Sequence, residues 1–210
     1  MKSFSSFRRD EQGAVMVEMT IAIVLLLTLT LGFVDFGNAY YQWNAATKAV
    51  QAGARMASIS DPIVPAVSQA GPATSPGAAV PAGSYDYVCN GATSACVCTG
   101  ASCANGAWVA ANFSRIFFGD DGACGPVAGS RPGMCDFFPR LEPENVVVRY
   151  TATGLGYQTR PSGSIPTITV SLQDVNFQFF FLSGLLGFDD ITMPSMLSTV
   201  TGEDMSSTAP

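Results

Sequence analysis

The fold of this chain is decided by residues 14–34, which read AVMVEMTIAIVLLLTLTLGFV. The run contains 21 residues and a single charged side chain, Glu18. As an α-helix with a rise of about 1.5 Å per residue it is ~31 Å long, which matches the ~30 Å hydrocarbon core of a bilayer. The stretch therefore predicts a transmembrane helix over residues 14–34.

The charges that flank this run predict its orientation. Lys2, Arg8 and Arg9 precede it, whereas Lys48 is the only cation among the next 20 residues. Cytoplasmic flanks of membrane helices carry an excess of Lys and Arg, so the N-terminus is expected in the cytoplasm and the C-terminal part outside it.

Two other interpretations of residues 14–34 are a buried core helix and a cleaved secretory signal. A core helix seldom has so long an apolar run at the very N-terminus. A signal has an apolar region of about 7–15 residues that ends at a small-x-small cleavage site. Here the run is longer and Asp35-Phe36-Gly37-Asn38 follows it, so a retained helix is favoured.

Glu18 is an unusual residue at this position. A carboxylate at a helix centre in the membrane costs about 2.5–3.5 kcal/mol, and such residues are commonly functional and paired. If the chain were cut after Gly13, the new amine would lie on Ala14, one helical turn from Glu18 and on the same face. Glu18 would then pair with the amine of its own helix or with that of a neighbouring subunit.

These features resemble a known family. A basic leader, Gly13, four apolar residues after the cut and Glu18 resemble the processing site of type IV prepilins. The sequence VDFGNAYYQWNAATKAVQAGARMAS that follows, residues 34–58, is similar to TadE-like minor pilins of the tight adherence pilus. Met19 departs from the aromatic residue common in major pilins. The family-motif residues of the helix are Asp35, Phe36, Gly37, Tyr40, Tyr41, Gly53, Ala54 and Arg55.

The resemblance implies a function and a location. It implies a minor pilin or pseudopilin that a prepilin peptidase cuts between Gly13 and Ala14, with N-methylation of Ala14. Such a protein takes part in priming, or forms the tip or base, of a pilus for surface attachment. The implied partners are the major pilin, other minor pilins, the peptidase and an assembly platform. The implied location is the bacterial inner membrane, with a single pass and a periplasmic C-terminal domain, and then the extracellular pilus.

Residues 35–60 predict an extension of the same helix outside the membrane. Small and apolar residues recur there at steps of four and three, which gives a 3.5-residue stripe along one face. Asn38, Gln42 and Arg55 fall off this stripe. Packing on the chain's own C-terminal domain is favoured over helix–helix packing in a filament, although a pilin uses both. The stripe comprises Gly32, Phe36, Ala39, Trp43, Ala46, Val50, Gly53 and Ala57.

A connector and a cysteine-rich region follow the helix. Residues 61–84 are rich in Pro, Gly, Ala and Ser, which predicts an extended, loosely packed linker. Residues 85–140 contain all six cysteines, without the paired knuckles or His ligands of a zinc site, so no metal is expected. Outside the cytoplasm three disulfides are expected, and the sequence leaves fifteen pairings open. The cysteines are Cys89, Cys96, Cys98, Cys103, Cys124 and Cys135.

The C-terminal part, residues 141–201, predicts antiparallel strands. The runs 145–153 and 165–181 are rich in β-branched residues and suggest a hairpin with a long loop, and 191–201 suggests a further strand. Residues 177–188 hold a cluster of Phe and Leu, for which packing against the long helix is favoured over an exposed contact patch. Residues 202–210 are expected to form a frayed tail.

The composition excludes several classes of protein. The chain has no His, 12% charged residues and a net charge of −6. Ser–His and Cys–His dyads are thus absent, and phosphate-based nucleic-acid binding is not expected. A tethered hydrolase would need a carboxylate pair, but Asp189 and Asp190 are adjacent and would point apart in a strand.

The predicted fold is α+β, with the long N-terminal helix packed on a small antiparallel sheet that carries a disulfide-rich loop insertion. No cofactor and no catalytic residue is expected. The main alternative function is a signal-anchored extracytoplasmic adhesion or binding protein without a filament role.

Overall fold

The structure is a computed structural model that describes residues 11–125, 127–187, 191–202 and 205–207. The chain divides into two compact units: residues 1–41 with 177–191, and residues 42–176 with 192–210. Helix α1 runs through both. The remaining α-helices are α2 (Ala110–Phe118), α3 (Met134–Phe137) and α4 (Leu182–Leu186). Two 3-10 helices are η2 (Pro65–Gln69) and η3 (Pro143–Asn145).

Helix α1 is one continuous element from Glu11 to Ile59. No proline occurs between residues 11 and 61, so nothing in the backbone interrupts the helical hydrogen bonds. Pro62 disfavours helical geometry at the residue before it, and the helix stops at Ile59. The helix predicted over residues 14–60 is confirmed.

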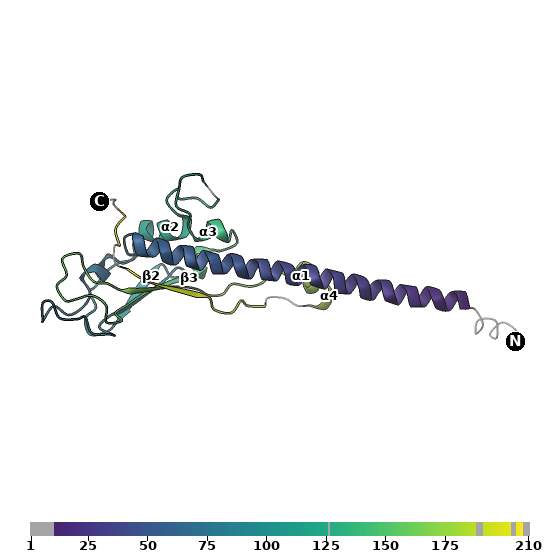
Figure 1. Ribbon diagram of the computed structural model, residues 1–210, viewed down its shortest axis with the longest axis horizontal. Helices are drawn as coiled ribbons and strands as arrows, with labels where there is room; N and C mark the ends of the chain where they lie inside the picture. Colours follow the sequence, from purple (N-terminus) through teal and green to yellow (C-terminus); the bar gives the residue numbers. More distant parts are fainter. Residues whose placement is uncertain (1–10, 126, 188–190, 203–204, 208–210) are drawn as a thin grey trace. The chain divides into compact units, whose positions relative to one another are not determined.

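The second unit contains a five-stranded antiparallel sheet in the order β2-β1-β3-β4-β5. Figure 1 labels β2 and β3. Alternate residues of β3 and β4 are buried, as expected for a sheet with one face on the core. The hairpin predicted from the runs 145–153 and 165–181 is confirmed in β3 and β4. The strands are Asp86–Asn90, Ala95–Thr99, Val146–Thr151, Thr167–Leu172 and Leu197–Thr201.

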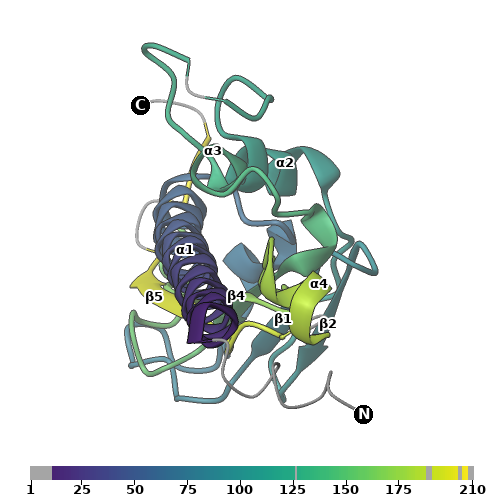
Figure 2. The same cartoon turned by 90° about the vertical axis from the view of Figure 1, so that its right-hand side faces the viewer.

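The outer part of α1, residues 42–59, packs in this second unit. Ala46, Val50 and Ala57 are at most 1% exposed, so the predicted stripe is confirmed in this part of the helix. The Thr47 hydroxyl donates a hydrogen bond to Met196 Sδ, beside β5, at 3.6 Å. Helices α2 and α3 lie next to each other in this unit (Figure 2).

The cysteine-rich region is more regular than a loop. Its residues supply β1 and β2, two of the five strands. Cys89 and Cys96 face each other across these strands and form a disulfide. The three disulfides are Cys89–Cys96, Cys98–Cys103 and Cys124–Cys135.

The connector is packed, contrary to the expectation of a loose linker. Ile63, Val64 and Val67 are fully buried, and the segment contains η2. The Ile63 amide donates a hydrogen bond to the Tyr150 hydroxyl at 3.2 Å. Burial raises the pKa of that hydroxyl, which therefore stays neutral. The proline content predicted that residues 61–84 form no α-helix. It did not predict this burial, because Ala and Val between the prolines face the core.

Candidate functional site

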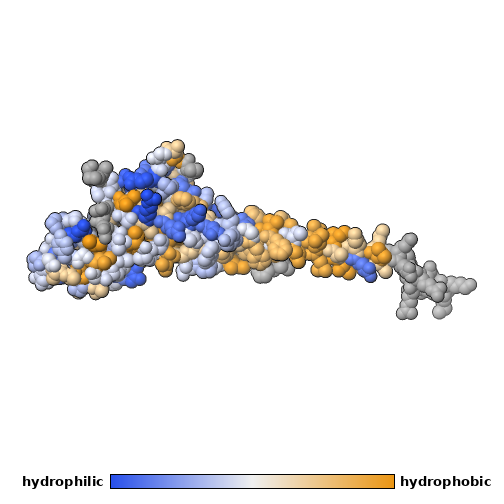
Figure 3. Space-filling model, in the orientation of Figure 1, coloured by the Kyte–Doolittle hydropathy of each residue, from blue (hydrophilic) through white to orange (hydrophobic). Residues whose placement is uncertain are grey.

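The part of α1 between Gly13 and Val34 is uncovered. Its large apolar side chains are 47–68% exposed, apart from Met16 at 75% and Leu31, which is half-buried. Within the described residues, one helix is long and apolar enough to span a membrane, and it contains this part. Figure 3 shows the apolar surface that results. In water such a surface would be unfavourable, so it indicates a lipid or helix-bundle environment.

The hydroxyl groups of the apolar run are satisfied within the helix. Side chains that cannot reach water need internal hydrogen-bond partners. Three threonine hydroxyls each donate to a backbone carbonyl about one turn earlier. The pairs are Thr20 with Met16 at 2.8 Å, Thr28 with Val24 at 2.8 Å and Thr30 with Leu27 at 2.9 Å.

Gly13, Ala14 and Glu18 lie on the helix and are exposed. The structure thus places Ala14 and Glu18 one turn apart, as the sequence predicts. A Cβ atom added at Gly13 would meet no described atom within 4 Å, so the fold itself gives no packing reason for glycine there. No described residue donates a hydrogen bond to Glu18. The basic leader residues Lys2, Arg8 and Arg9 lie outside the described residues.

Asp35, directly after the apolar run, is the buried polar centre of the first unit. Its side chain is fully buried. Its carboxylate accepts three backbone hydrogen bonds, to Oδ1 from the Phe180 amide at 2.8 Å and to Oδ2 from the amides of Phe181 and Leu182 at 2.9 and 2.6 Å. These amides lead into α4, which begins at Leu182 and whose first N–H groups have no partner inside the helix. Asp35 therefore joins α1 to a segment 145 residues later.

Further hydrogen bonds hold the same segment. The Asn38 side-chain amide donates to the Gln178 carbonyl at 2.9 Å, one turn beyond Asp35. The Phe177 amide donates to the Ile191 carbonyl at 2.9 Å, which closes the base of the segment. Figure 1 shows α4 beside α1 in this region.

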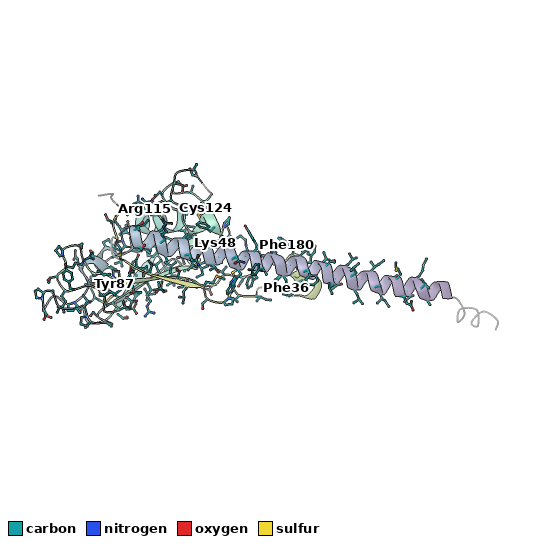
Figure 4. All side chains as sticks on the ribbon, viewed as in Figure 1. Phe36, Lys48, Tyr87, Arg115, Cys124 and Phe180 are labelled. Atoms are coloured by element: carbon teal, nitrogen blue, oxygen red, sulfur yellow. A yellow bond between two sulfur atoms is a disulfide. The ribbon has the colours of Figure 1, made fainter. Side chains whose placement is uncertain are left out.

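No described side chain of the Phe-rich segment is buried. Phe180 is 65% exposed and Phe181 is 42% exposed, while Phe177, Phe179 and Leu182 are half-buried. Figure 4 marks Phe180 and Phe36 in this part of the molecule. The expectation of a core cluster is therefore wrong for Phe180 and Phe181, because their backbone amides are held by Asp35 while their rings point away. Phe188, Asp189 and Asp190 lie outside the described residues.

The family-motif residues fall into two groups. Phe36, Tyr40 and Tyr41 are 64–71% exposed, and Gly37 has open space around it. The exposure of Phe36 contradicts its place on the predicted packing stripe. By contrast, buried Gly53 and Ala54 face the domain. Arg55 is exposed in a groove of about 510 Å³ that Lys48 and Arg131 also line.

Gly53 allows a close approach between α1 and α3. A Cβ atom there would lie 2.5 Å from Met134 Sδ and 2.7 Å from its Cγ, and Met134 is fully buried. We expect Gly53→Leu to destabilise the second unit by about 1–3 kcal/mol through overpacking. Thermal unfolding followed by circular dichroism in detergent measures this loss. Gly37→Leu, the same change in open space, is the control, and an equal loss at both positions would contradict the packing argument.

Two contacts were missed at the level of sequence. Gln42, expected off the packing face, is 4% exposed, and its Oε1 accepts a hydrogen bond from Arg140 Nη1 at 2.7 Å. Desolvation lowers the pKa of the Arg140 guanidinium, which remains charged. The link from Asp35 to residues 180–182 was also missed. Its only sequence signal is a lone acid at the end of an apolar run.

Comparison with known proteins agrees with the resemblance. Residues 13–55 match a family model described as TadE-like protein, and the resemblance is confirmed over this range. The match covers the apolar run, Asp35 and the helix as far as Arg55. It points to a pilin-like structural protein associated with a Tad pilus, and not to a known enzyme family. No curated protein and no solved structure matches the chain.

Proposed function

We propose, from the TadE-like match of residues 13–55, that this protein is a minor pilin or pseudopilin of a tight adherence pilus. It is made as a membrane-inserted precursor with its N-terminus in the cytoplasm. A prepilin peptidase cuts it between Gly13 and Ala14, and Ala14 is N-methylated. The mature protein joins the major pilin and other minor pilins on an inner-membrane assembly platform and takes part in priming, or forms the tip or base, of the pilus.

Glu18 is the residue that best supports this proposal. It is the one charged residue of the run 14–34, it is exposed, and it lies one turn from Ala14. An unpaired carboxylate in a membrane helix is unfavourable, but the amine that cleavage creates would neutralise it. The pairing, made within one helix or between subunits, would set the axial register of the helix in a filament.

The uncovered apolar surface of α1 also supports the proposal. No described residue between Gly13 and Val34 is buried, and only Thr28, Leu31 and Gly32 are half-buried. Such a surface suits lipid before assembly and a bundle of like helices afterwards, where van der Waals packing between helices replaces contact with lipid. The second unit, stabilised by three disulfides, would stand on the periplasmic side, where thiols oxidise.

The processing step has a direct test in intact-mass spectrometry of membrane-extracted protein without reduction. We expect a chain that starts at methylated Ala14, lighter by two hydrogen atoms for each of the three disulfides. Gly13→Leu should abolish cleavage, because a large side chain would not fit a subsite shaped for glycine. Gly13→Ala is the matched control and should still be cut.

The outcomes separate the two functions. A parent chain that keeps residues 1–13 would leave the signal-anchored adhesion or binding protein as the better description. Cleavage of Gly13→Leu at the same rate as the parent would show that glycine is not what the peptidase recognises.

A further inference from the structure

We propose that residues 177–187 form a second membrane contact, which lies in the headgroup layer of the bilayer that α1 spans, on the side of the C-terminal domain. The segment reads FQFFFLSGLLG and has no charged residue. This inference rests on the proposed membrane span of residues 14–34. It assigns a ligand, the lipid surface, to a segment that the pilin function leaves unused.

Asp35 sets the depth of the segment. It follows Val34 directly, and a helix of 21 residues from Ala14 to Val34 fills the hydrocarbon core. Residue 35 therefore lies at the boundary between acyl chains and headgroups. The hydrogen bonds from Phe180, Phe181 and Leu182 to its carboxylate hold the start of α4 at the same level.

The polar groups of the segment suit the edge of the hydrocarbon core, where water is scarcer than in solution. Backbone N–H groups and carboxylates are costly at that depth unless each has a partner. Asp35 and the first turn of α4 satisfy one another, and Asn38 satisfies the Gln178 carbonyl. The segment can therefore approach lipid without an unpaired group at the Asp35 contact.

The exposed side chains favour lipid as the occupant. Phe180 and Phe181 are exposed on the segment, and Phe33 and Phe36 are exposed on α1 at the neighbouring levels, 68% and 64%. Aromatic rings are enriched at the membrane interface, and an apolar patch without charges that continues a membrane span meets lipid first. A protein partner at this patch is the alternative that the experiment must separate.

Depth-dependent quenching of tryptophan fluorescence tests the proposal. Full-length Phe180→Trp protein is reconstituted in phosphatidylcholine vesicles that carry bromine either near the top or near the end of the acyl chains. The parent, which contains Trp43 and Trp108, gives the baseline. Leu26→Trp and Val97→Trp are matched controls, because these residues are 61% and 64% exposed, close to Phe180.

We expect the added emission of Phe180→Trp to be lost mainly to shallow bromine and that of Leu26→Trp mainly to deep bromine, while Val97→Trp is unaffected. Quenching at Leu26 but not at Phe180 would overturn the second contact and leave the membrane span intact. No quenching at Leu26 would overturn the span and this inference with it. Intact mass without reduction confirms that each variant has formed its disulfides.

Discussion

Asp35→Asn is expected to release the start of α4 from α1. The two oxygens of Asp35 accept three amide hydrogen bonds, two of them on Oδ2. Asparagine places an NH₂ group where one oxygen stood, so at least one amide faces a donor in either orientation of the side chain. The charge that strengthens the remaining bonds is lost as well. Each buried donor left unpaired costs about 1–3 kcal/mol.

Hydrogen–deuterium exchange of the amides of residues 180–182 measures this release. A loss of about 1–3 kcal/mol corresponds to roughly 5–150-fold faster exchange if these amides exchange by local opening. The sheet should keep its protection, because β3 and β4 pair through their own backbone groups. The prediction is therefore a local effect.

Asp174→Asn is the matched control for the Asp35 variant. It removes the same charge from an exposed position in the chain just before the segment, and its positive φ of 54° is one that asparagine tolerates. Its side chain accepts none of the three amide bonds. Unchanged exchange at residues 180–182 in Asp35→Asn, or an equal change in Asp174→Asn, would contradict the role of Asp35.

The regular elements were predictable where a local pattern sets them. Residues 14–34 are apolar apart from Glu18 and three threonines, and Val146, Val148 and Tyr150 alternate with more exposed positions as a half-buried strand requires. Strands β1 and β2 were not predicted, because each has five residues and holds cysteines that match no strand pattern. Strand β1 pairs with β2 across the Cys89–Cys96 disulfide and also with β3, which lies more than fifty residues away.

The polar contacts of α1 were not predictable from a 3.5-residue stripe. A straight helix has 3.6 residues per turn, so the buried face drifts by about 20° per heptad relative to that stripe. We count back along α1 from Gly53 at 3.6 residues per turn. The row of buried positions then passes close to Gln42 and reaches Asp35 after about five turns. The 3.5-residue stripe includes neither Gln42 nor Asp35. It places Phe36 on the buried face, although Phe36 is exposed. The partners of Asp35 are remote backbone amides, which no side-chain pattern reveals.

Glu18→Ala is expected to abolish entry into pili while leaving membrane insertion and cleavage intact. The substitution removes a carboxylate that costs about 2.5–3.5 kcal/mol at a helix centre, so insertion should not weaken. Gly13 and Ala14 are unchanged, so the peptidase still finds its site. In the filament, however, the amine of Ala14 would be buried without a partner, at a cost of about 3–5 kcal/mol.

That cost corresponds to roughly 150- to 5,000-fold less protein in the filament at equilibrium. Intact mass of the membrane fraction reports insertion and cleavage, and immunoblotting of sheared pili reports incorporation. Glu18→Asp keeps the charge and should retain part of the incorporation, which separates the role of charge from that of side-chain length. Normal incorporation of Glu18→Ala would mean that the amine is neutralised by another group, and the register would then depend on helix packing alone.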